Sequence, residues 1–294
     1  MKLASFHHQG GMHFGRVEAD EVVVLSERDD APAGVRELLA LGEGGLAWAR
    51  SERAGDRRIA LNSVELLAPV PNPQKYLALG GNYPSHLAEA VKAGVVRGTG
   101  QVWFNKQVSC INAPFADVLK PWISDYFDYE GELGIVIGTR CRHVRAEDAE
   151  SVIAGYVVCN DMSVRDWQLR SPTHTLGKSF DTHGPFGPWL VTRDEVPDPH
   201  ALRLRTWVNG ELRQDANTSE MTNRVGAMIA ELSTAFTLEP GDVLSTGSPA
   251  GVGGLMAPPR YLQPGDRVRV EIERIGAIEN RVAAEPKSPH RTQS

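Results

Sequence analysis

Cysteine is scarce in this sequence and follows no binding pattern. The three cysteines, Cys110, Cys141 and Cys159, lie far apart in a chain of 294 residues. Disulfide frameworks and zinc knuckles both require closely spaced cysteines, so neither class of protein fits. We expect a reducing compartment, the cytoplasm, and we expect Cys159 to be a small core residue of an apolar strand.

Long apolar runs and an excess of positive charge are missing as well. No stretch approaches the ~18 consecutive apolar residues of a membrane span, and residues 1–11 do not have the pattern of an export signal. Lys and Arg number 31 against 37 Asp and Glu, which gives a net charge of −6. A surface that binds nucleic acid needs clustered basic residues. We therefore expect neither a membrane nor a nucleic acid as a partner.

Glycine and proline, by contrast, are abundant. The chain has 29 glycines and 19 prolines, and 41% of its residues are hydrophobic. This composition favours a globular protein rich in strands and turns. One amphipathic helix is predicted over residues 222–236, so the expected fold class is α+β and rich in β structure. Short apolar runs typical of strands lie at residues 2–6, 22–25, 133–138, 153–159, 189–192, 202–208, 243–246 and 268–272.

A proline-rich stretch divides the chain. Residues 66–73 contain three prolines, which is typical of a linker and predicts a boundary near residue 70. We expect a small N-terminal β domain over residues 1–70 and a larger domain over residues 71–282. The polar tail at residues 283–294 is expected to be disordered.

Two glutamates that flank a glycine are the first residues whose spacing indicates a functional site. Glu130 and Glu132 are two apart, and alternate side chains of a strand emerge on the same face, so their carboxylates should lie side by side. The glycine between them lets a neighbour approach the backbone closely. Asp161, at the end of the next apolar strand, could add a third carboxylate, and this all-oxygen set suits Mg²⁺ or Mn²⁺. The alternative is that the glutamates belong to a solvated strand face.

A polar segment, residues 160–168, follows directly after an apolar strand. Arg165 and Gln168 are three apart and would project together from a helical turn, offering a guanidinium and an amide. The alternative is a helix cap with a surface ion pair. Further along, Lys178 could stabilise an oxyanion with its ammonium group, or it could be an ordinary exposed lysine.

Residues 82–90 carry the signals of a helix start. The three-residue spacing places His86 and Glu89 on one face, where the carboxylate could orient the imidazole as a general base. An ordinary surface pair is the alternative. Because the segment that follows is glycine-bearing and irregular, we expect residues 83–101 to be mobile without ligand and to close over the site.

A glycine-rich turn, residues 246–253, follows another strand. It lacks the lysine of a phosphate-binding loop, so a nucleotide site is rejected. We expect the turn to contact a substrate through its backbone N–H groups and the Thr246 hydroxyl, unless it is only a tight structural turn.

Taken in order, these motifs resemble the fumarylacetoacetate hydrolase family over residues 74–281. The ordered set is far more specific than any single motif. It comprises Gly81-Asn82-Tyr83-x-x-His86-x-x-Glu89, Phe104-Asn105-Lys106, Asp128-Tyr129-Glu130-Gly131-Glu132-Leu133, Asn160-Asp161-x-Ser163-x-Arg165-Asp166-x-Gln168, Gly177-Lys178-Ser179-Phe180-Asp181, Gly187-Pro188-Trp189, Val208-Asn209-Gly210 and Thr246-Gly247-Ser248-Pro249-x-Gly251-Val252-Gly253.

The resemblance implies a mixed β-sandwich roll with a small N-terminal β domain, usually in a homodimer. It implies one Mg²⁺ or Mn²⁺ held by Glu130, Glu132 and Asp161. Family substrates are 2,4-dioxo acids or related enol-pyruvate compounds, whose adjacent oxygens chelate the metal. The catalytic residues implied are His86, Glu89 and Lys178, and the substrate-binding residues are Tyr83, Lys106, Arg165, Gln168, Thr246 and Gly247.

The function expected first is metal-dependent hydrolysis of a carbon–carbon bond in an acylpyruvate or related 1,3-dicarbonyl compound. His86 would take a proton from the attacking water. The alternatives are an isomerase or a decarboxylase acting on a hydroxymuconate-type or oxaloacetate-type substrate, and a non-catalytic binding protein. Many family members have Phe-Leu-Lys-Pro where this chain has residues 104–107, Phe-Asn-Lys-Gln, so the acyl group stays open.

Overall fold

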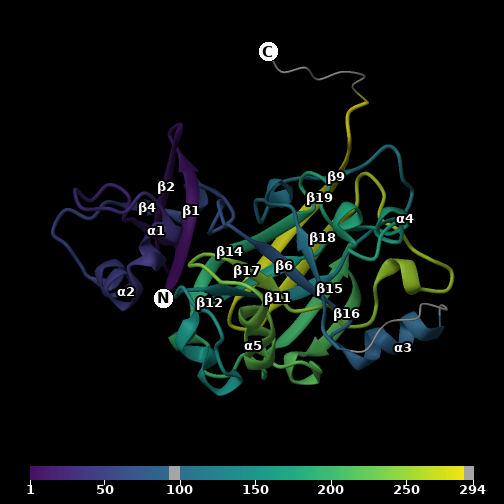
Figure 1. The fold of residues 1–294 in the computed structure, drawn as a ribbon. Coiled ribbons are helices and arrows are strands. Elements are labelled where there is room, and N and C mark those ends of the chain that lie inside the picture. Colours follow the sequence, from purple (N-terminus) through teal and green to yellow (C-terminus); the bar gives the residue numbers. More distant parts are fainter. Residues whose placement is uncertain (93–99, 288–294) are drawn as a thin grey trace, which may run out of the picture.

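The computed structural model describes residues 1–92 and 100–287, and most of their strands join in one large sheet of twelve strands (Figure 1). Because β17 and β6 run parallel within an otherwise mostly antiparallel sheet, the sheet is mixed. Its path is β4 (Arg58–Ala60), β3 (Glu21–Val24), β2 (Gly11–Glu18), β1 (Lys2–His8), β14 (Gly184–Thr192), β12 (Ile153–Asn160), β11 (Gly131–Ile137), β17 (Val243–Ser245), β6 (Tyr76–Gly80) and β7 (Val102–Lys106), with β5 (Glu65–Leu66) beside β1 and β8 (Ile111–Asn112) beside β14.

A second sheet of five strands packs against the centre of the first. Its order is β16 (Glu211–Asn217), β15 (Arg203–Val208), β18 (Arg267–Ile272), β19 (Gly276–Ala284) and β9 (Val118–Lys120), and a separate pair is formed by β10 (Phe127–Asp128) and β13 (Ser163–Val164).

The helices are short and lie around these sheets. The α-helices are α1 (Val35–Ala40), α2 (Gly42–Arg50), α3 (Pro84–Lys92), α4 (Arg165–Gln168) and α5 (Val225–Ala235). The 3-10 turns are η1 (Leu61–Ser63), η2 (Val108–Cys110), η3 (Ala146–Val152), η4 (Thr175–Lys178), η5 (Arg193–Glu195), η6 (Thr218–Glu220) and η7 (Gly253–Leu255). None of the helices in the part of the chain that the structure describes combines the length and apolar character needed to cross a membrane.

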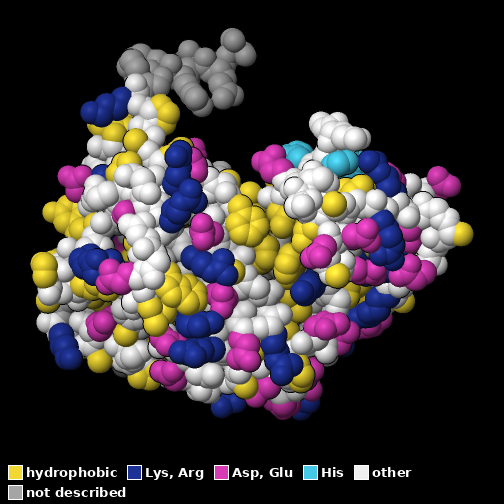
Figure 2. Space-filling model, turned by 180° about the vertical axis from the view of Figure 1, so that it is seen from behind, with side chains coloured by type: hydrophobic (Ala, Val, Ile, Leu, Met, Phe, Trp, Pro, Cys, Tyr) yellow, Lys and Arg dark blue, Asp and Glu magenta, His cyan; other side chains and the backbone are white. Residues whose placement is uncertain are grey.

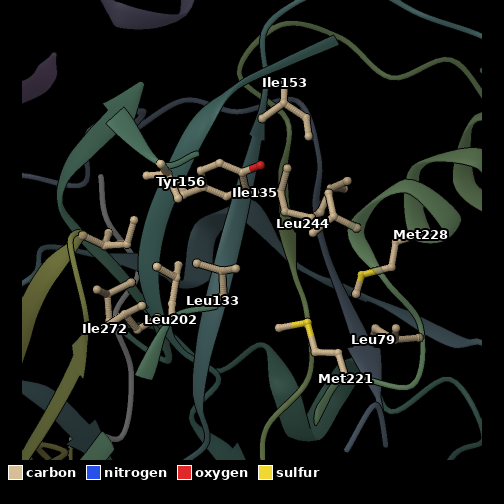
Figure 3. Close-up of a cluster of buried hydrophobic side chains, with 14 of the residues drawn as sticks. Leu79, Leu133, Ile135, Ile153, Tyr156, Leu202, Met221, Met228, Leu244 and Ile272 are labelled. Atoms are coloured by element: carbon tan, nitrogen blue, oxygen red, sulfur yellow. The ribbon is translucent and has the colours of Figure 1, made fainter. Parts of the chain in front are cut away.

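The main core lies between the two sheets and beneath α5. Strand β11 is buried at every position because both of its faces are covered. Its Leu133 and Ile135 point into the inter-sheet core, together with Tyr156 of β12 and Met228 of α5 (Figure 3). Strand β15 alternates between buried and more exposed positions, as expected when only one face of a strand is covered.

The N-terminal strands continue the large sheet rather than forming a separate one. Strand β1 pairs antiparallel with β14, with Leu3 opposite Leu190. Helices α1 and α2 cover this part, and their apolar residues share a core with residues of the larger domain, including Phe186. The two-domain division at residue 70 stays a prediction, and the sheet crosses that boundary.

Two expectations about chain segments change in the structure. The tail was expected to begin at residue 283, but β19 runs through Ala284, which pairs with Lys120 of β9. Residues 288–294, the end of the expected tail, lie outside the described residues. Within the expected mobile segment 83–101, residues 84–92 form the helix α3, and residues 93–99 lie outside the described residues.

Candidate metal centre

Three carboxylates meet where β11 begins and β12 ends. Glu132 belongs to β11, Glu130 directly precedes it, and Asp161 directly follows β12. The antiparallel register pairs Gly131 with Asn160, so these two strand ends lie side by side. One oxygen from each carboxylate lies within 4.8 Å of the others, and all three residues are buried. The alternative that the two glutamates lie on a solvated strand face is therefore wrong.

The donor set fits a hard divalent cation. Three buried carboxylates offer only oxygen ligands, the kind that Mg²⁺ and Mn²⁺ prefer. Burial, with Asp161 and Glu130 nearby, raises the pKa of Glu132 well above its usual value. Burial also raises the pKa of Glu130, but Lys178 and Arg165 outweigh it and hold that pKa well below the usual value. The residues present thus suit the expected cofactor.

Two buried lysines bracket the carboxylates. The Lys178 ammonium lies between two of them, 2.7 Å from Glu130 Oε2 and 2.7 Å from Asp161 Oδ2. Lys178 is 1% exposed, which excludes the exposed-lysine alternative. Lys106 reaches the other oxygen of Asp161 at 2.6 Å and also donates to the backbone carbonyl of Lys178. The Lys106 ammonium is thus buried behind Asp161, and its expected role in substrate binding stays a prediction.

Arg165 and Gln168 project together from α4, as the spacing predicted. Arg165 Nη1 donates to Glu130 Oε1 at 2.7 Å and to Gln168 Oε1 at 3.0 Å. Its Nε donates to Asp128 Oδ2 at 2.9 Å. The pair is thus tied to the carboxylate cluster and is not a surface ion pair.

A cavity of about 150 Å³ adjoins these groups. His86 enters the cavity from α3. It is only 4% exposed, so the alternative that His86 and Glu89 form an ordinary pair on the surface is excluded. His86 Nδ1 lies 4.0 Å from Glu89 Oε2. The Glu89 carboxylate instead accepts the backbone N–H of Gly251 at 3.0 Å. The lining consists of His86, Ala90, Arg165, Gln168, Leu169, Gly254, Leu255 and Tyr261.

The glycine-rich turn directs its N–H groups mainly at protein carboxylates. Gly247 N donates to Glu132 Oε2 at 2.8 Å, and the Ser245 hydroxyl donates to the same oxygen at 2.6 Å. The Gly247 N–H is therefore already engaged by Glu132, and the expected substrate contact of Gly247 stays a prediction. The Thr246 hydroxyl is buried without a hydrogen-bond partner, so it remains available to a ligand.

Tyr83 also departs from its expected role. It is fully buried and belongs to the main hydrophobic core with Leu79. Burial raises the pKa of its phenol, and Glu132 adds to that effect. Tyr83 therefore supports the start of α3 from within and does not line the cavity.

Two supporting residues were missed from the sequence. Asp128 is fully buried and accepts the backbone N–H groups of Gly253 and Gly254 at 2.8 and 2.9 Å, while it also binds Arg165. The sequence could have identified Asp128, because it lies two residues before Glu130, the same spacing that separates Glu130 from Glu132. Ser245 gave no comparable signal, since a serine at a strand end is common.

A larger cavity of about 740 Å³ lies elsewhere, between the N-terminal strands and the roll. Figure 2 shows hydrophobic side chains gathering where the surface is hollowed between two lobes. The lining includes Leu66, Phe115 and Trp189 and contains none of the clustered carboxylates. Its lining has two carboxylates, Asp20 and Glu65, but no histidine, lysine or arginine, so we place the site at the smaller cavity.

The fold and the site together define a strand-rich α+β protein with a buried cluster of three carboxylates, suited to a divalent cation, beside a histidine-bearing cavity. Residues 75–283 match the family described as fumarylacetoacetate (FAA) hydrolase C-terminal, and residues 1–69 match the one described as Rv2993c-like, N-terminal. The chain belongs to the fumarylacetoacetate hydrolase family.

Similar proteins of this family include enzymes of more than one kind. A mitochondrial oxaloacetate tautomerase of Xenopus laevis is 42% identical over 269 residues, which cover 90% of this chain and 83% of the relative. The structure of a fumarylacetoacetate hydrolase from Exiguobacterium antarcticum aligns with a TM-score of 0.85 at 37% identity, over 97% of this chain and all 100% of the other. A Sphingobium maleylpyruvate hydrolase, solved with manganese and pyruvate, aligns with a TM-score of 0.82 at 33% identity, over the same shares of 97% and 100%.

Proposed function

We propose that this protein is a divalent-metal-dependent enzyme that interconverts the keto and enol forms of a small 2-oxo dicarboxylate of the oxaloacetate type. The observation that carries the proposal is the direct connection, through Arg165, between the carboxylate cluster and a small cavity that contains His86. The oxaloacetate tautomerase relative, 42% identical, supports the same reaction class.

The residues that would hold the ion are Glu130, Glu132 and Asp161. When bound, Mg²⁺ or Mn²⁺ supplies Lewis-acid stabilisation of negative charge on the substrate oxygens. Ser245 and Gly247 hold one oxygen of Glu132, and the two lysines hold both oxygens of Asp161. Supporting hydrogen bonds of this kind fix the orientation of metal ligands.

Enolisation requires a group that removes a proton from the carbon next to the oxo group. Among the residues that line the cavity, His86 is the one with an imidazole, the side chain that most often acts as a general base. Its Nδ1 is buried without a hydrogen-bond partner, so the ring is not committed to another residue through that atom. His86 is therefore the proposed base, and Thr246 the proposed contact to the 2-oxo end.

The far carboxylate of such a substrate needs donors at the other side of the cavity. Arg165 lines the cavity and carries a permanent positive charge. The Gln168 oxygen already accepts from Arg165, so its amide nitrogen is the part that remains to donate. These two residues would fix the distance between the reacting carbon and His86.

Hydrolysis of an acylpyruvate, the function expected first from the sequence, is the second candidate. The same imidazole could take a proton from water, and the maleylpyruvate hydrolase structure with manganese and pyruvate favours this reaction. We place tautomerisation first because the oxaloacetate tautomerase relative is 42% identical to this chain and the maleylpyruvate hydrolase 33%.

A substrate panel separates the candidates. The purified protein would be given oxaloacetate, acylpyruvates and hydroxymuconate-type acids with Mg²⁺, with Mn²⁺ and with a chelator. We expect the ultraviolet absorbance of enol-oxaloacetate to decay faster with either ion, without pyruvate or CO₂ as product. Cleavage of acylpyruvates with no effect on oxaloacetate would instead establish the hydrolase. His86→Ala should lose activity while it keeps its affinity for Mn²⁺.

A further inference from the structure

Helix α3, which carries His86, is fixed firmly at its start. Asn82 lies two residues before the helix and is fully buried. Its amide nitrogen donates to the carbonyls of Thr246 and Asn223 at 2.8 and 3.1 Å, and its oxygen accepts the Asn223 N–H at 2.7 Å. The beginning of α3 is therefore anchored to the strand end beside the metal centre.

Beyond this anchor, little apolar burial holds the helix. Only His86 and Ala90 are buried among residues 84–92, and Val91 is 70% exposed. A helix of nine residues is too short to be stable by itself in water. Its position over the cavity must therefore depend on specific contacts.

One such contact is made by Glu89. Both carboxylate oxygens accept the N–H of Gly251, at 3.0 and 3.2 Å. The distance from Glu89 to His86 Nδ1, 4.0 Å, is too long for a hydrogen bond. The hydrogen bonds of the carboxylate therefore go to the turn, while the imidazole lies at ion-pair distance.

The turn that receives Glu89 also supports the metal centre. Its Gly247 N–H binds Glu132, and the N–H groups of its Gly253 and of the next residue, Gly254, bind Asp128, the partner of Arg165. A single backbone segment therefore ties the position of α3 to both the carboxylate cluster and the guanidinium of the cavity.

We infer that Glu89 is a latch: its carboxylate pins α3 to the Gly251 N–H and so keeps His86 in the cavity. Glu89 is a positioning residue that acts through the helix. Release of the latch would let α3 move away from the cavity about the Asn82 anchor. This inference does not depend on which reaction the enzyme catalyses.

Two substitutions of Glu89 separate the latch from an imidazole-orienting role. Glu89→Gln keeps an oxygen that accepts the Gly251 N–H but removes the charge. Glu89→Ala removes both. Hydrogen exchange of the α3 amides, measured by mass spectrometry on the full chain with Mn²⁺, reports the position of the helix without any substrate. Val91→Ala is the matched control, because it truncates an exposed side chain of the same helix.

We expect Glu89→Ala to speed exchange in α3 by about tenfold, and Glu89→Gln and Val91→Ala to stay close to the wild-type rate. The pH profile of turnover should be similar in Glu89→Gln and the wild type. Unchanged exchange in Glu89→Ala, or equal acceleration in Glu89→Gln and Glu89→Ala, would overturn the latch. Thermal unfolding of each variant distinguishes local release of α3 from global destabilisation, and a global loss in Glu89→Gln would also contradict the inference.

Discussion

At the scale of single residues, the metal centre is a nearly balanced set of buried charges. Its members are the carboxylates of Asp128, Glu130, Glu132 and Asp161 and the cations of Lys106, Lys178 and Arg165. With all groups in their usual ionised forms, one negative charge remains uncompensated. A divalent cation would reverse the sign of the site and make it attractive to an anionic substrate.

The ligand assignment gives a first prediction. Glu130→Gln and Glu132→Gln should each weaken Mn²⁺ binding by at least about tenfold, because each removes a charged oxygen ligand. Isothermal titration calorimetry measures the binding, and turnover should fall with it. Glu147→Gln, an exposed residue of η3, is the control and should bind like the wild type. Wild-type Mn²⁺ affinity in both ligand variants would refute the site.

His183 gives a prediction for stability. The ring is fully buried, stacked on Phe127 with centroids 4.6 Å apart, and its Nε2 lies 2.8 Å from the Leu119 carbonyl. Burial lowers the pKa of His183 to about 3, so the folded protein keeps the imidazole neutral. The unfolded chain takes up a proton below its pKa near 6.5, and the folded chain does not until about pH 3. The contribution of His183 to stability is therefore lost as the pH falls through this window.

The expected slope for this group is about 1.4 kcal/mol per pH unit below pH 6. Urea unfolding at several pH values between 7 and 5 measures it. His183→Gln should be less stable overall but should show a shallower dependence on pH over the same range. Parallel curves for the two proteins would show that His183 is not the titrating group.

At the scale of elements, the position of β11 depends on Gly131. A Cβ atom at this position would lie 2.2 Å from Thr206 Oγ1 and 3.0 Å from Val270 Cγ1, both in the second sheet. The sequence indicated that a neighbour approaches the backbone between the two glutamates. The structure identifies that neighbour as the five-stranded sheet and not a ligand.

Gly131→Ala should therefore lower the free energy of unfolding by roughly 1–3 kcal/mol, because the two sheets must separate locally. The same shift would displace Glu130 and Glu132 and weaken Mn²⁺ binding. Gly44→Ala is the matched control: Gly44 is exposed within α2, and a Cβ there meets nothing within 4 Å. It should be neutral or stabilising by about 0.5–1 kcal/mol. Equal urea midpoints for the two variants would contradict this account of β11.

At the scale of the whole molecule, one face exposes several large apolar side chains. Trp122 is 59% exposed, Tyr126 48%, Leu169 70% and Leu176 57%. The segments that carry them meet at α4: the Tyr126 carbonyl accepts the N–H of Arg165, Ser124 donates to Asp166, Leu169 follows α4, and η4 packs on it. Monomeric proteins rarely expose large contiguous apolar patches, so we propose that this face joins two copies in the homodimer implied by the family resemblance.

Sedimentation velocity tests the homodimer. The wild type should sediment as a dimer at micromolar concentration. The double variant Trp122→Glu with Leu169→Glu should shift to the monomer, because two charges would be buried at a symmetric interface. Met12→Glu is the control, since Met12 is 60% exposed on the N-terminal strands. A monomeric wild type, or a double variant that stays dimeric, would contradict the proposed face.

The residue patterns of the sequence predicted the framework of this protein because those patterns are local. Apolar spacing predicted α5, which the structure places at Val225–Ala235. The two-residue spacing of Glu130 and Glu132, with Asp161 at the next strand end, brought together the three carboxylates that the structure clusters. Strand β16 was not predicted because Glu211–Asn217 is mostly polar, and its strand conformation depends on pairing with β15.

Only the tertiary structure decided what each functional side chain faces. Lys106 became a support for Asp161 because β7 brings it behind the carboxylate, and Tyr83 became a core residue. Glu89 meets Gly251 across 162 positions of sequence. Such contacts depend on how distant segments pack, and packing fixes distances of a few ångströms that residue type and spacing along the chain do not contain.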